Sequence, residues 1–425
     1  MKVIIIGGGW SGVAAAITAK KAGAEVHIYE KTDLLLGLGN VGGIMRNNGR
    51  YTASEELNYL GAGDLIDIVD NTARHTDIEF PGHKHVTLYD VNLIEGNVRE
   101  YIVNMGINIH MESRVVDVNF KDGKIFGIYL SDDTYEEADV FIETTGTTGP
   151  MGNCLRYGNG CSMCILRCPS FGPRLSVSER CGVSDIQGER EDDILGAFSG
   201  SCKLAKESLS KEIQNQLDET GVVILEIPKE DVNYDKLATK VCQQYALKEF
   251  AENIILLDTG HAKLMTTYYP LHKLRKIKGL EKAKYVDPYA GSKGNSIRYL
   301  SVAPRTNDLK VNGVDNLFCA GEKSGLFVGH TEAIVTGSLA GHNAVRLSMG
   351  MHLLILPSSL AIGDIISYAN EKSTTREGRK QRFTFAGSDY FKRMKELGLY
   401  TTDKSEILNR IKKLNLNDIF AQKLL

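Results

Sequence analysis

Four closely spaced thiols are the residues of this sequence with the clearest capacity for chemistry. Five of the eight cysteines lie between Cys154 and Cys181, and the first four follow the spacing C-x6-C-x2-C-x3-C-P. Thiolates on short, glycine-containing spacers can hold an iron–sulfur cluster, and C-x2-C-x3-C-P matches part of a bacterial ferredoxin run. We therefore predict a cluster, most simply 4Fe–4S, bound by Cys154, Cys161, Cys164 and Cys168. Cys181 is the alternative to Cys154 as fourth ligand.

Other interpretations of these thiols stay open. A redox-active disulfide between Cys161 and Cys164 would suit a neighbouring redox cofactor. Structural zinc also takes four thiolates, but it usually joins two C-x2-C knuckles, and this stretch has one. The thiols could also be unligated. We expect Cys202 and Cys242 to lie on helices in the core, and Cys319 to be a packing residue.

A glycine-rich turn near the N-terminus predicts a dinucleotide site. The apolar run 2–6 is typical of a buried parallel strand, and the residues 7–12 after it read G-x-G-x-x-G. A helix is expected from Val13 to about Ala22, and a second strand over 25–29 ends at Glu30. Such a turn brings a pyrophosphate onto the helix N-terminus, while the acid accepts hydrogen bonds from a ribose.

The later elements resemble the flavoproteins of the glutathione-reductase superfamily. Strands are expected over 107–119, 124–130 and 138–143, the last running into Thr145-Gly146, and a late strand over 316–322 precedes a helix from about His330 to Arg346. The resemblance implies an α/β protein with a glutathione-reductase-type, Rossmann-like FAD-binding domain. In that fold, Glu322 would contact the ribityl chain, and the N-terminus of the helix that follows would point at the flavin.

Three segments narrow the resemblance to the GidA/MnmG and TrmFO group of RNA-modifying flavoproteins. They are residues 278–283, 317–346 and 355–364, with the glycine-rich loop 37–43 where that group has a loop near the flavin. TrmFO-like enzymes carry a cysteine in or near the stretch corresponding to 37–49, and this chain has none before Cys154. We therefore predict an FAD-dependent oxidoreductase whose flavin exchanges electrons with the cluster. The alternative is a folate- and FAD-dependent RNA uridine methyltransferase, with Cys168 as a substitute nucleophile.

The predicted site residues follow from these motifs and resemblances. Weak candidates for catalysis are His330, Cys168 and His261. The residues expected to bind FAD are Gly7, Gly9, Trp10, Ser11, Gly12, Glu30, Lys31, Gly39, Asn40, Gly42, Gly43, Val115, Thr145, Gly146, Gly321, Glu322, Gly329, His330 and Thr331.

The expected organisation has five parts. Residues 1–150 and 301–350 form the two parts of the FAD-binding domain, 151–185 a cysteine-rich loop, 186–300 an inserted α+β substrate or cap region, and 351–425 a helical region. Within the insertion, the charged stretch 189–219 and residues 231–252 are patterned as helices, and 222–227 as a strand.

Charge and composition suggest the compartment and the partners. The chain has 425 residues and a formal charge of −3, so an overall basic character is excluded, although residues 351–425 hold 13 Lys and Arg against 8 Asp and Glu. With neither a secretory signal nor an apolar span expected, we predict a cytoplasmic protein away from membranes. The expected partner is a small molecule or a redox protein such as a ferredoxin, and RNA is the alternative partner.

Overall fold

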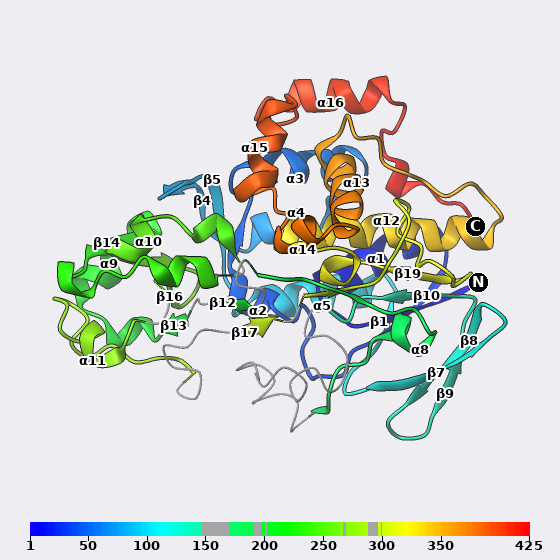
Figure 1. Ribbon diagram of the computed structural model, residues 1–425, viewed down its shortest axis with the longest axis horizontal. Coiled ribbons are helices and arrows are strands. Elements are labelled where there is room, and N and C mark those ends of the chain that lie inside the picture. Colours follow the sequence, from blue (N-terminus) through cyan, green and yellow to red (C-terminus); the bar gives the residue numbers. More distant parts are fainter. Residues whose placement is uncertain are drawn as a thin grey trace.

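A five-stranded parallel sheet lies at the centre of the computed structural model, which describes residues 1–146, 171–190, 197–199, 202–240, 242–266, 269–287, 296–298 and 300–425. The strand order is β19–β10–β1–β2–β6 (Figure 1). The strands are β1 (Lys2–Ile6), β2 (Glu25–Tyr29), β6 (Asn108–His110), β10 (Val140–Glu143) and β19 (Leu317–Cys319).

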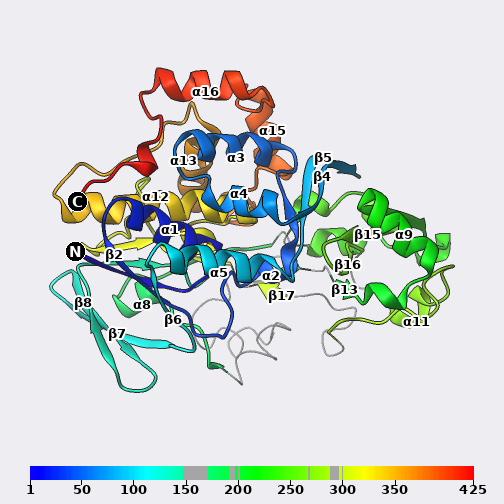
Figure 2. The ribbon, with the colours of Figure 1, turned by 180° about the vertical axis from the view of Figure 1, so that it is seen from behind.

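Both faces of this sheet are covered, which explains the unbroken apolar run in β1. Val3 and Ile5 belong to the core that includes helices α1 (Trp10–Lys21) and α12 (His330–Ser348). Ile4 and Ile6 point to the other face, against the antiparallel meander β7 (Val115–Lys121), β8 (Lys124–Leu130) and β9 (Tyr135–Glu137) (Figure 2). The predicted α/β fold of the glutathione-reductase type is confirmed.

Most predicted elements of this domain are present, with shifted ends. Helix α1 begins at Trp10 rather than Val13, because the glycine turn itself carries the first helical residues. The single strand expected over 107–119 is wrong: β6 ends at His110, and β7 begins at Val115 in a different sheet. A turn in which Glu112 has a positive φ of 52° separates the two strands.

The inserted region is built on a four-stranded antiparallel sheet, β13–β16–β15–β14 (Figure 1). Its strands are β13 (Cys202–Leu204), β14 (Val222–Glu226), β15 (Asn253–Asp258) and β16 (Ala262–Leu264). Along β15, Ile254 and Leu256 join the core beneath helix α9 (Lys211–Thr220). Ile255 and Leu257 pack instead with the sheet of β3 (Ile44–Met45), β4 (Ala73–Phe80) and β5 (His83–Tyr89).

Two separate two-stranded antiparallel sheets lie where the chain enters and leaves the inserted region. Strand β11 (Ile186–Gln187) pairs with β18 (Ser301–Val302), and β12 (Ala197–Ser199) pairs with β17 (Ser296–Arg298). The chain therefore enters and leaves the insertion side by side. The five predicted domain boundaries themselves stay predictions.

Of the two long helices expected in the insertion, the first is confirmed only over its last part, as α9, and the second is wrong. The first helix was expected over 189–219. Of its residues 202–219, which the structure describes without a gap, only 211–219 are α-helical, and Cys202 lies on strand β13. Residues 231–252 form short 3-10 turns and α10 (Glu249–Glu252), so Cys242 lies outside a long helix. The physical reason is tertiary: the Gln244 carbonyl accepts a hydrogen bond from the buried His83 ring, 3.1 Å away, instead of a helical amide.

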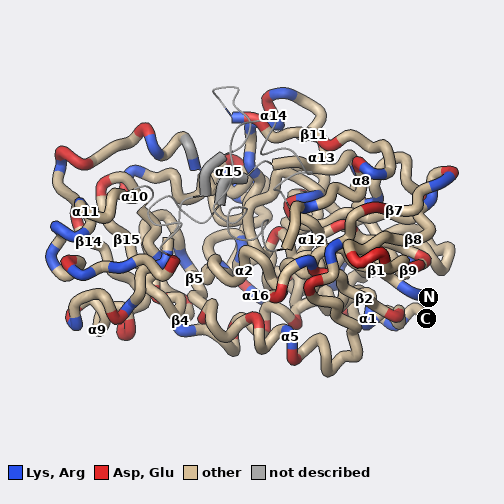
Figure 3. The backbone as a smooth tube through the Cα atoms, turned by 90° about the horizontal axis from the view of Figure 1, so that it is seen from below, with Lys and Arg blue, Asp and Glu red and all other residues tan. Residues whose placement is uncertain are grey.

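The C-terminal region is helical, as expected, and covers α3 (Gly49–Tyr59). It contains α13 (Ala361–Ser373), α14 (Arg376–Lys380), α15 (Ser388–Glu396) and α16 (Lys404–Lys413). The buried Glu56 carboxylate on α3 accepts the amides of Ala361 and Ile362, each at 3.0 Å, at the start of α13. Seen from below, Lys and Arg and also Asp and Glu are spread over the chain without a large region of one sign (Figure 3).

The remaining helices are α2 (Gly39–Gly42), α4 (Asp64–Asn71), α5 (Ile94–Asn104), α8 (Val177–Arg180) and α11 (Leu271–Leu274). Within the described ranges, every helix is too short or too polar to cross a lipid bilayer.

Two buried histidines make the fold sensitive to acid. Burial lowers the pKa of His83 to about 3 and that of His342 to about 4. In the unfolded chain the pKa of a histidine is near 6.5. Below that pH the histidine therefore binds a proton in the unfolded state but not in the folded state. The stability that these two neutral histidines contribute is therefore complete above pH 6.5, and it falls as pH decreases toward 4, by about 1.4 kcal/mol per pH unit for each histidine.

Urea unfolding between pH 7.5 and 4.5 measures this loss. In His83→Gln an amide nitrogen still donates to the Gln244 carbonyl and an amide oxygen still faces Asn47, but the side chain cannot bind the proton. We expect a shallower pH dependence for this variant than for wild type, while substitution of the exposed His352 leaves the dependence unchanged. Equal slopes for His83→Gln and wild type would contradict the assignment.

Candidate functional site

A long cavity begins at the carboxyl end of β1, where the glycine turn lies. The volume of this cavity is about 260 Å³. A Cβ at Gly12 would lie 2.0 Å from the Gly7 carbonyl oxygen, so only glycine lets α1 approach the strand. A Cβ at Gly9 would meet nothing within 4 Å, because that residue faces the cavity. The turn is therefore closely packed behind and open in front, as a phosphate cradle must be.

The acid at the end of β2 is fixed beside this turn. One Glu30 oxygen accepts the Gly8 amide at 2.8 Å, and the other accepts the Thr32 amide at 2.9 Å and its hydroxyl at 2.8 Å. Lys31, the next residue, donates to the Gly172 carbonyl at 2.7 Å. Glu30 and Lys31 both line the cavity, so they are held where a ribose would bind.

At its other end the cavity meets the start of α12. The His330 ring packs so closely on the loop 37–43 that a Cβ at Gly42 would lie 1.9 Å from its Cε1. Tyr89 joins the two, because its hydroxyl donates to the Gly39 carbonyl at 2.8 Å and lies 3.2 Å from His330 Nδ1. Trp10 completes this aromatic group, with its ring 5.7 Å from that of His330.

Most of the predicted cofactor residues line this one cavity. Those that do so are Gly7, Gly9, Trp10, Ser11, Glu30, Lys31, Gly42, Val115, Thr145, Gly146, Gly321, Glu322, Gly329 and His330. Gly12, Gly39, Asn40, Gly43 and Thr331 lie behind the lining and pack or position it. Of the candidates for catalysis, His330 lines the cavity, and His261 lies in the turn between β15 and β16, away from the lining.

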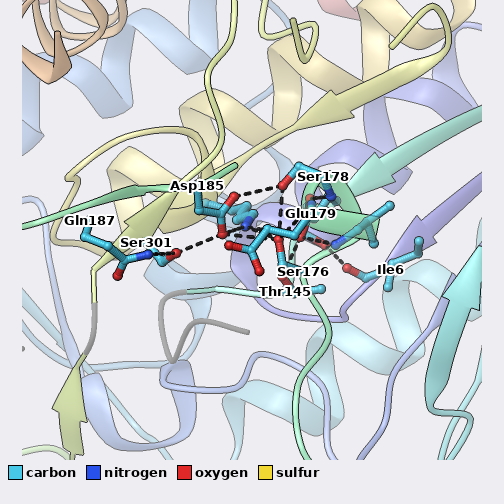
Figure 4. A network of polar contacts seen from close by, with 12 residues as sticks. Ile6, Thr145, Ser176, Ser178, Glu179, Asp185, Gln187 and Ser301 are labelled. Atoms are coloured by element: carbon cyan, nitrogen blue, oxygen red, sulfur yellow. Dashed lines mark hydrogen bonds and ion pairs between the residues drawn. The ribbon is translucent and has the colours of Figure 1, made fainter. Parts of the chain in front are cut away.

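A buried network fixes both chain ends that flank the cysteine-rich stretch (Figure 4). Glu143, at the end of β10, accepts the amides of Val177 and Ser178 at 2.8 and 2.9 Å and the Thr145 hydroxyl at 3.1 Å. The Lys323 ammonium lies 3.5 Å from Glu143 and forms an ion pair with Asp185. Described residues on both sides of the stretch, Thr145 and Gly146 before it and 173–175 after it, line the cavity.

The four predicted cluster ligands, Cys154, Cys161, Cys164 and Cys168, lie outside the described residues. The alternative ligand, Cys181, is buried in the core beneath the meander, and burial raises the pKa of its thiol to about 12. Cys202 and Cys319 are core residues as expected. Among the residues that the structure describes, no His, Cys, Asp and Glu side chains form a group of three suited to a metal ion.

Sequence reasoning missed the part of the cavity wall that the insertion supplies. Its residues are Lys240, Cys242, Gln244, Tyr245, Lys263 and Met265, and Arg50 joins them from α3. Cys242, expected in the core, is a free, half-buried thiol at the cavity wall. No motif marks these residues, because loop contacts rather than sequence spacing bring them together.

Lys240 is the most unusual of them. Its ammonium group is buried, donates to the carbonyls of Tyr245 and Met265 at 3.3 and 3.2 Å, and lies 5.0 Å from the centre of the Phe250 ring. Burial lowers the pKa of Lys240 to about 8. An amine with that pKa exists in both protonation states near neutral pH, so it can bind an anion or exchange a proton.

The lining fits an anionic dinucleotide cofactor. A buried polar atom on the wall, Gln244 Oε1, lacks a hydrogen-bond partner in the described protein, so a ligand could satisfy it. Positive charge exceeds negative charge on the wall, where Lys31, Arg50, Arg114, Arg174, Lys240 and Lys263 face Glu30 and Glu322. A pyrophosphate entering this field gains electrostatic stabilisation.

The parallel sheet, the glycine turn and the cavity define a dinucleotide-binding protein of the glutathione-reductase type. Residues 2–254 and 243–352 match the family described as Glucose inhibited division protein A. The chain belongs to this GidA family, as the resemblance predicted.

Individual relatives agree with this assignment. The chain is 24% identical over 406 residues to the tRNA uridine 5-carboxymethylaminomethyl modification enzyme MnmG of Mycoplasma mycoides, covering 83% of this chain and 63% of that protein. It is 32% identical over 133 residues to the methylenetetrahydrofolate–tRNA-(uracil-5-)-methyltransferase TrmFO of Bacillus licheniformis, covering 31% of this chain and 28% of the relative. The chain spans less than two thirds of the length of the curated relatives it matches.

A solved structure supports the fold. Aquifex aeolicus GidA superposes with a TM-score of 0.63 at 16% sequence identity, covering 97% of this chain and 76% of that one.

Proposed function

We propose that this chain is an FAD-dependent oxidoreductase. The observation that carries the proposal is the cavity, which joins a glycine turn open at Gly9, an acid fixed at Glu30 and the start of α12 at His330. Gly9 and Ser11 would bind the pyrophosphate, and Glu30 the ribose. Bound FAD would supply transfer of one or two electrons. His330 and the loop 37–43 would shape the other end and exclude water there.

We further propose that Cys154, Cys161, Cys164 and Cys168 hold an iron–sulfur cluster that exchanges electrons with this flavin. Support comes from their spacing and from the flanking chain, since Gly146 and residues 173–175 on either side of the stretch line the cavity. For electron transfer, the cluster would have to lie close to the flavin. A small molecule or a redox protein such as a ferredoxin would then be the partner.

The second candidate function is modification of a uridine in RNA. The similarity to MnmG and TrmFO proteins favours it, and so does the half-buried Cys242 thiol at the cavity wall. The early-loop cysteine expected from the resemblance is missing, but Cys242 brings a thiol to the same cavity from the insertion. The sequence holds no cysteine before Cys154, so Cys242 is the candidate nucleophile that the described part of the cavity wall offers.

Protein purified without oxygen distinguishes these functions. We expect a flavin absorption spectrum, FAD released on denaturation, and about four irons with matching sulfide per chain. Cys161→Ser should lose the iron and keep the FAD, while Cys319→Ser, a buried control, should keep both. FAD without iron in the wild type would remove the cluster proposal. Transfer of a methylene group from a reduced folate to a uridine-containing RNA would establish the second candidate.

A further inference from the structure

The amides of the turn α2 (Gly39–Gly42) in the cavity wall bond to the residues just before it, but its first three carbonyls are bound by groups from elsewhere in the chain. A four-residue turn cannot satisfy its own carbonyls, and two of its residues are glycines that allow many backbone conformations. The Gly39 carbonyl accepts the Tyr89 hydroxyl at 2.8 Å. The next two carbonyls, of Asn40 and Val41, accept lysines from the inserted sheet. Val41 and Gly42 line the cavity, so the conformation of the turn sets the shape of the wall.

The two lysines act as a pair. Lys203 on β13 and Lys263 on β16 are direct partners in the antiparallel register, so their side chains lie next to each other. Lys203 Nζ donates to the Asn40 carbonyl at 2.8 Å, and Lys263 Nζ donates to the Val41 carbonyl at 2.6 Å. Two neighbouring strands of the insertion thus bind two successive carbonyls of one turn.

This arrangement has an electrostatic cost that a purely structural contact would avoid. Like charges directly opposite each other on a sheet are destabilising, and burial lowers the pKa of Lys203, with Asp287 acting in the opposite direction. Lys263 is also buried. A charged donor bonds a carbonyl more strongly than a neutral one, so the pair gives the turn a fixed position that glycines alone cannot provide.

We infer that Lys203 and Lys263 are positioning residues that hold the turn 39–42 in its cofactor-binding shape and couple the inserted sheet to occupancy of the cavity. The inference rests on the proposed FAD site. Because coupling between two sites is reciprocal, FAD binding must in turn stabilise strands β13 and β16. The insertion is then a part of the cofactor site and not only a cover for it.

The test compares Lys203→Met, Lys263→Met and the double variant with wild type. Methionine keeps an unbranched side chain of similar length but cannot donate to the carbonyls. Lys273→Met is the matched control, because Lys273 lies in the same inserted region but pairs with Asp231 away from the cavity. FAD affinity is measured by quenching of flavin fluorescence, and hydrogen exchange of amides 39–43 is measured in the FAD-free protein.

We expect each single variant to bind FAD about tenfold more weakly, as loss of one charge-assisted hydrogen bond predicts, and the double variant more weakly still. Amides 39–43 should exchange faster in the variants without FAD. Added FAD should protect β13 and β16 in wild type but not in the double variant. Lys273→Met should behave as wild type.

Two results would overturn the inference: FAD affinities within twofold of wild type, or unchanged exchange of 39–43 in the double variant. If wild type itself fails to bind FAD, the proposed cofactor is wrong, while exchange in the FAD-free protein still decides whether the lysines hold the turn. If amides throughout the inserted region of the double variant exchange faster, that variant is unfolded there. The FAD affinity and the exchange of amides 39–43 in the single variants then test the inference.

Discussion

Gly9→Val is expected to fold normally and to lose FAD. Gly9 has a backbone conformation that any residue can adopt, with φ −68° and ψ −178°, and a Cβ there meets no protein atom within 4 Å. The added side chain therefore enters the cavity, where the pyrophosphate would approach the backbone. We expect at least a hundredfold weaker FAD binding, which corresponds to about 2.7 kcal/mol, with a melting temperature of the FAD-free protein within a few degrees of wild type.

Gly12→Val provides the contrast. A Cβ at this position would lie 2.0 Å from the Gly7 carbonyl oxygen, which is backbone and cannot move away cheaply. Overpacking of this kind costs about 1–3 kcal/mol or more, so Gly12→Val should lower the melting temperature even without FAD. If Gly9→Val retained wild-type FAD affinity, the cavity would not be the cofactor site. The two substitutions in one motif are thus expected to have different effects: Gly9→Val weakens FAD binding, and Gly12→Val destabilises the fold.

Arg50→Met is expected to have the largest effect on stability. The Arg50 guanidinium is buried and lies 3.2 Å from the Glu332 carboxylate, which is itself fully buried at 0% exposure. Arg50 also donates to the Asn47 side chain at 3.0 Å and to the Val328 carbonyl at 2.9 Å. Its removal leaves a buried carboxylate without its cation, which costs about 3–5 kcal/mol in comparable pairs. Urea unfolding of the FAD-free protein measures the loss.

A double variant shows whether the unpaired Glu332 carboxylate causes the loss of stability in Arg50→Met. Arg50→Met with Glu332→Gln should recover part of the loss, because the remaining amide can still accept from Thr384 and the Phe385 amide and carries no charge. Lys392→Met serves as the surface control, since Lys392 and Glu396 are both exposed and 3.9 Å apart, and it should cost less than about 1 kcal/mol. A loss for Arg50→Met as small as that of the control would contradict the assignment.

The ion pair between Arg50 and Glu332 connects elements that lie far apart in the sequence. Arg50 lies on α3 near the N-terminus, Glu332 on the first turn of α12, and Phe385, whose amide Glu332 accepts, in the C-terminal region. Arg50 also lines the cavity. The segment between α14 and α15 therefore contacts an ion pair behind the cavity, although residues 351–425 contribute nothing to the lining within the described part of the chain.

The sequence by itself determined the dinucleotide-binding half of the protein. The strand 2–6, the glycine turn and Glu30 are contiguous, and their roles follow from local geometry, because a turn between a strand and a helix needs glycine wherever backbone approaches backbone. The late strand and the helix from His330 were predicted on the same grounds. In each case neighbouring residues carry both the signal and the structure.

Only the tertiary structure decided the wall that the insertion supplies. The helix predicted over 231–252 does not form, because the Gln244 carbonyl bonds to His83 and Lys240 bonds to carbonyls of its neighbours. Lys263 and Cys242 line the cavity, and Lys203 bonds to the turn 39–42 in its wall, through contacts between strands and loops far apart in sequence. No local pattern encodes such contacts, since each depends on the position of a separate element. The family of the chain was therefore evident from its sequence, while the part of the cavity wall that the insertion supplies came from long-range packing.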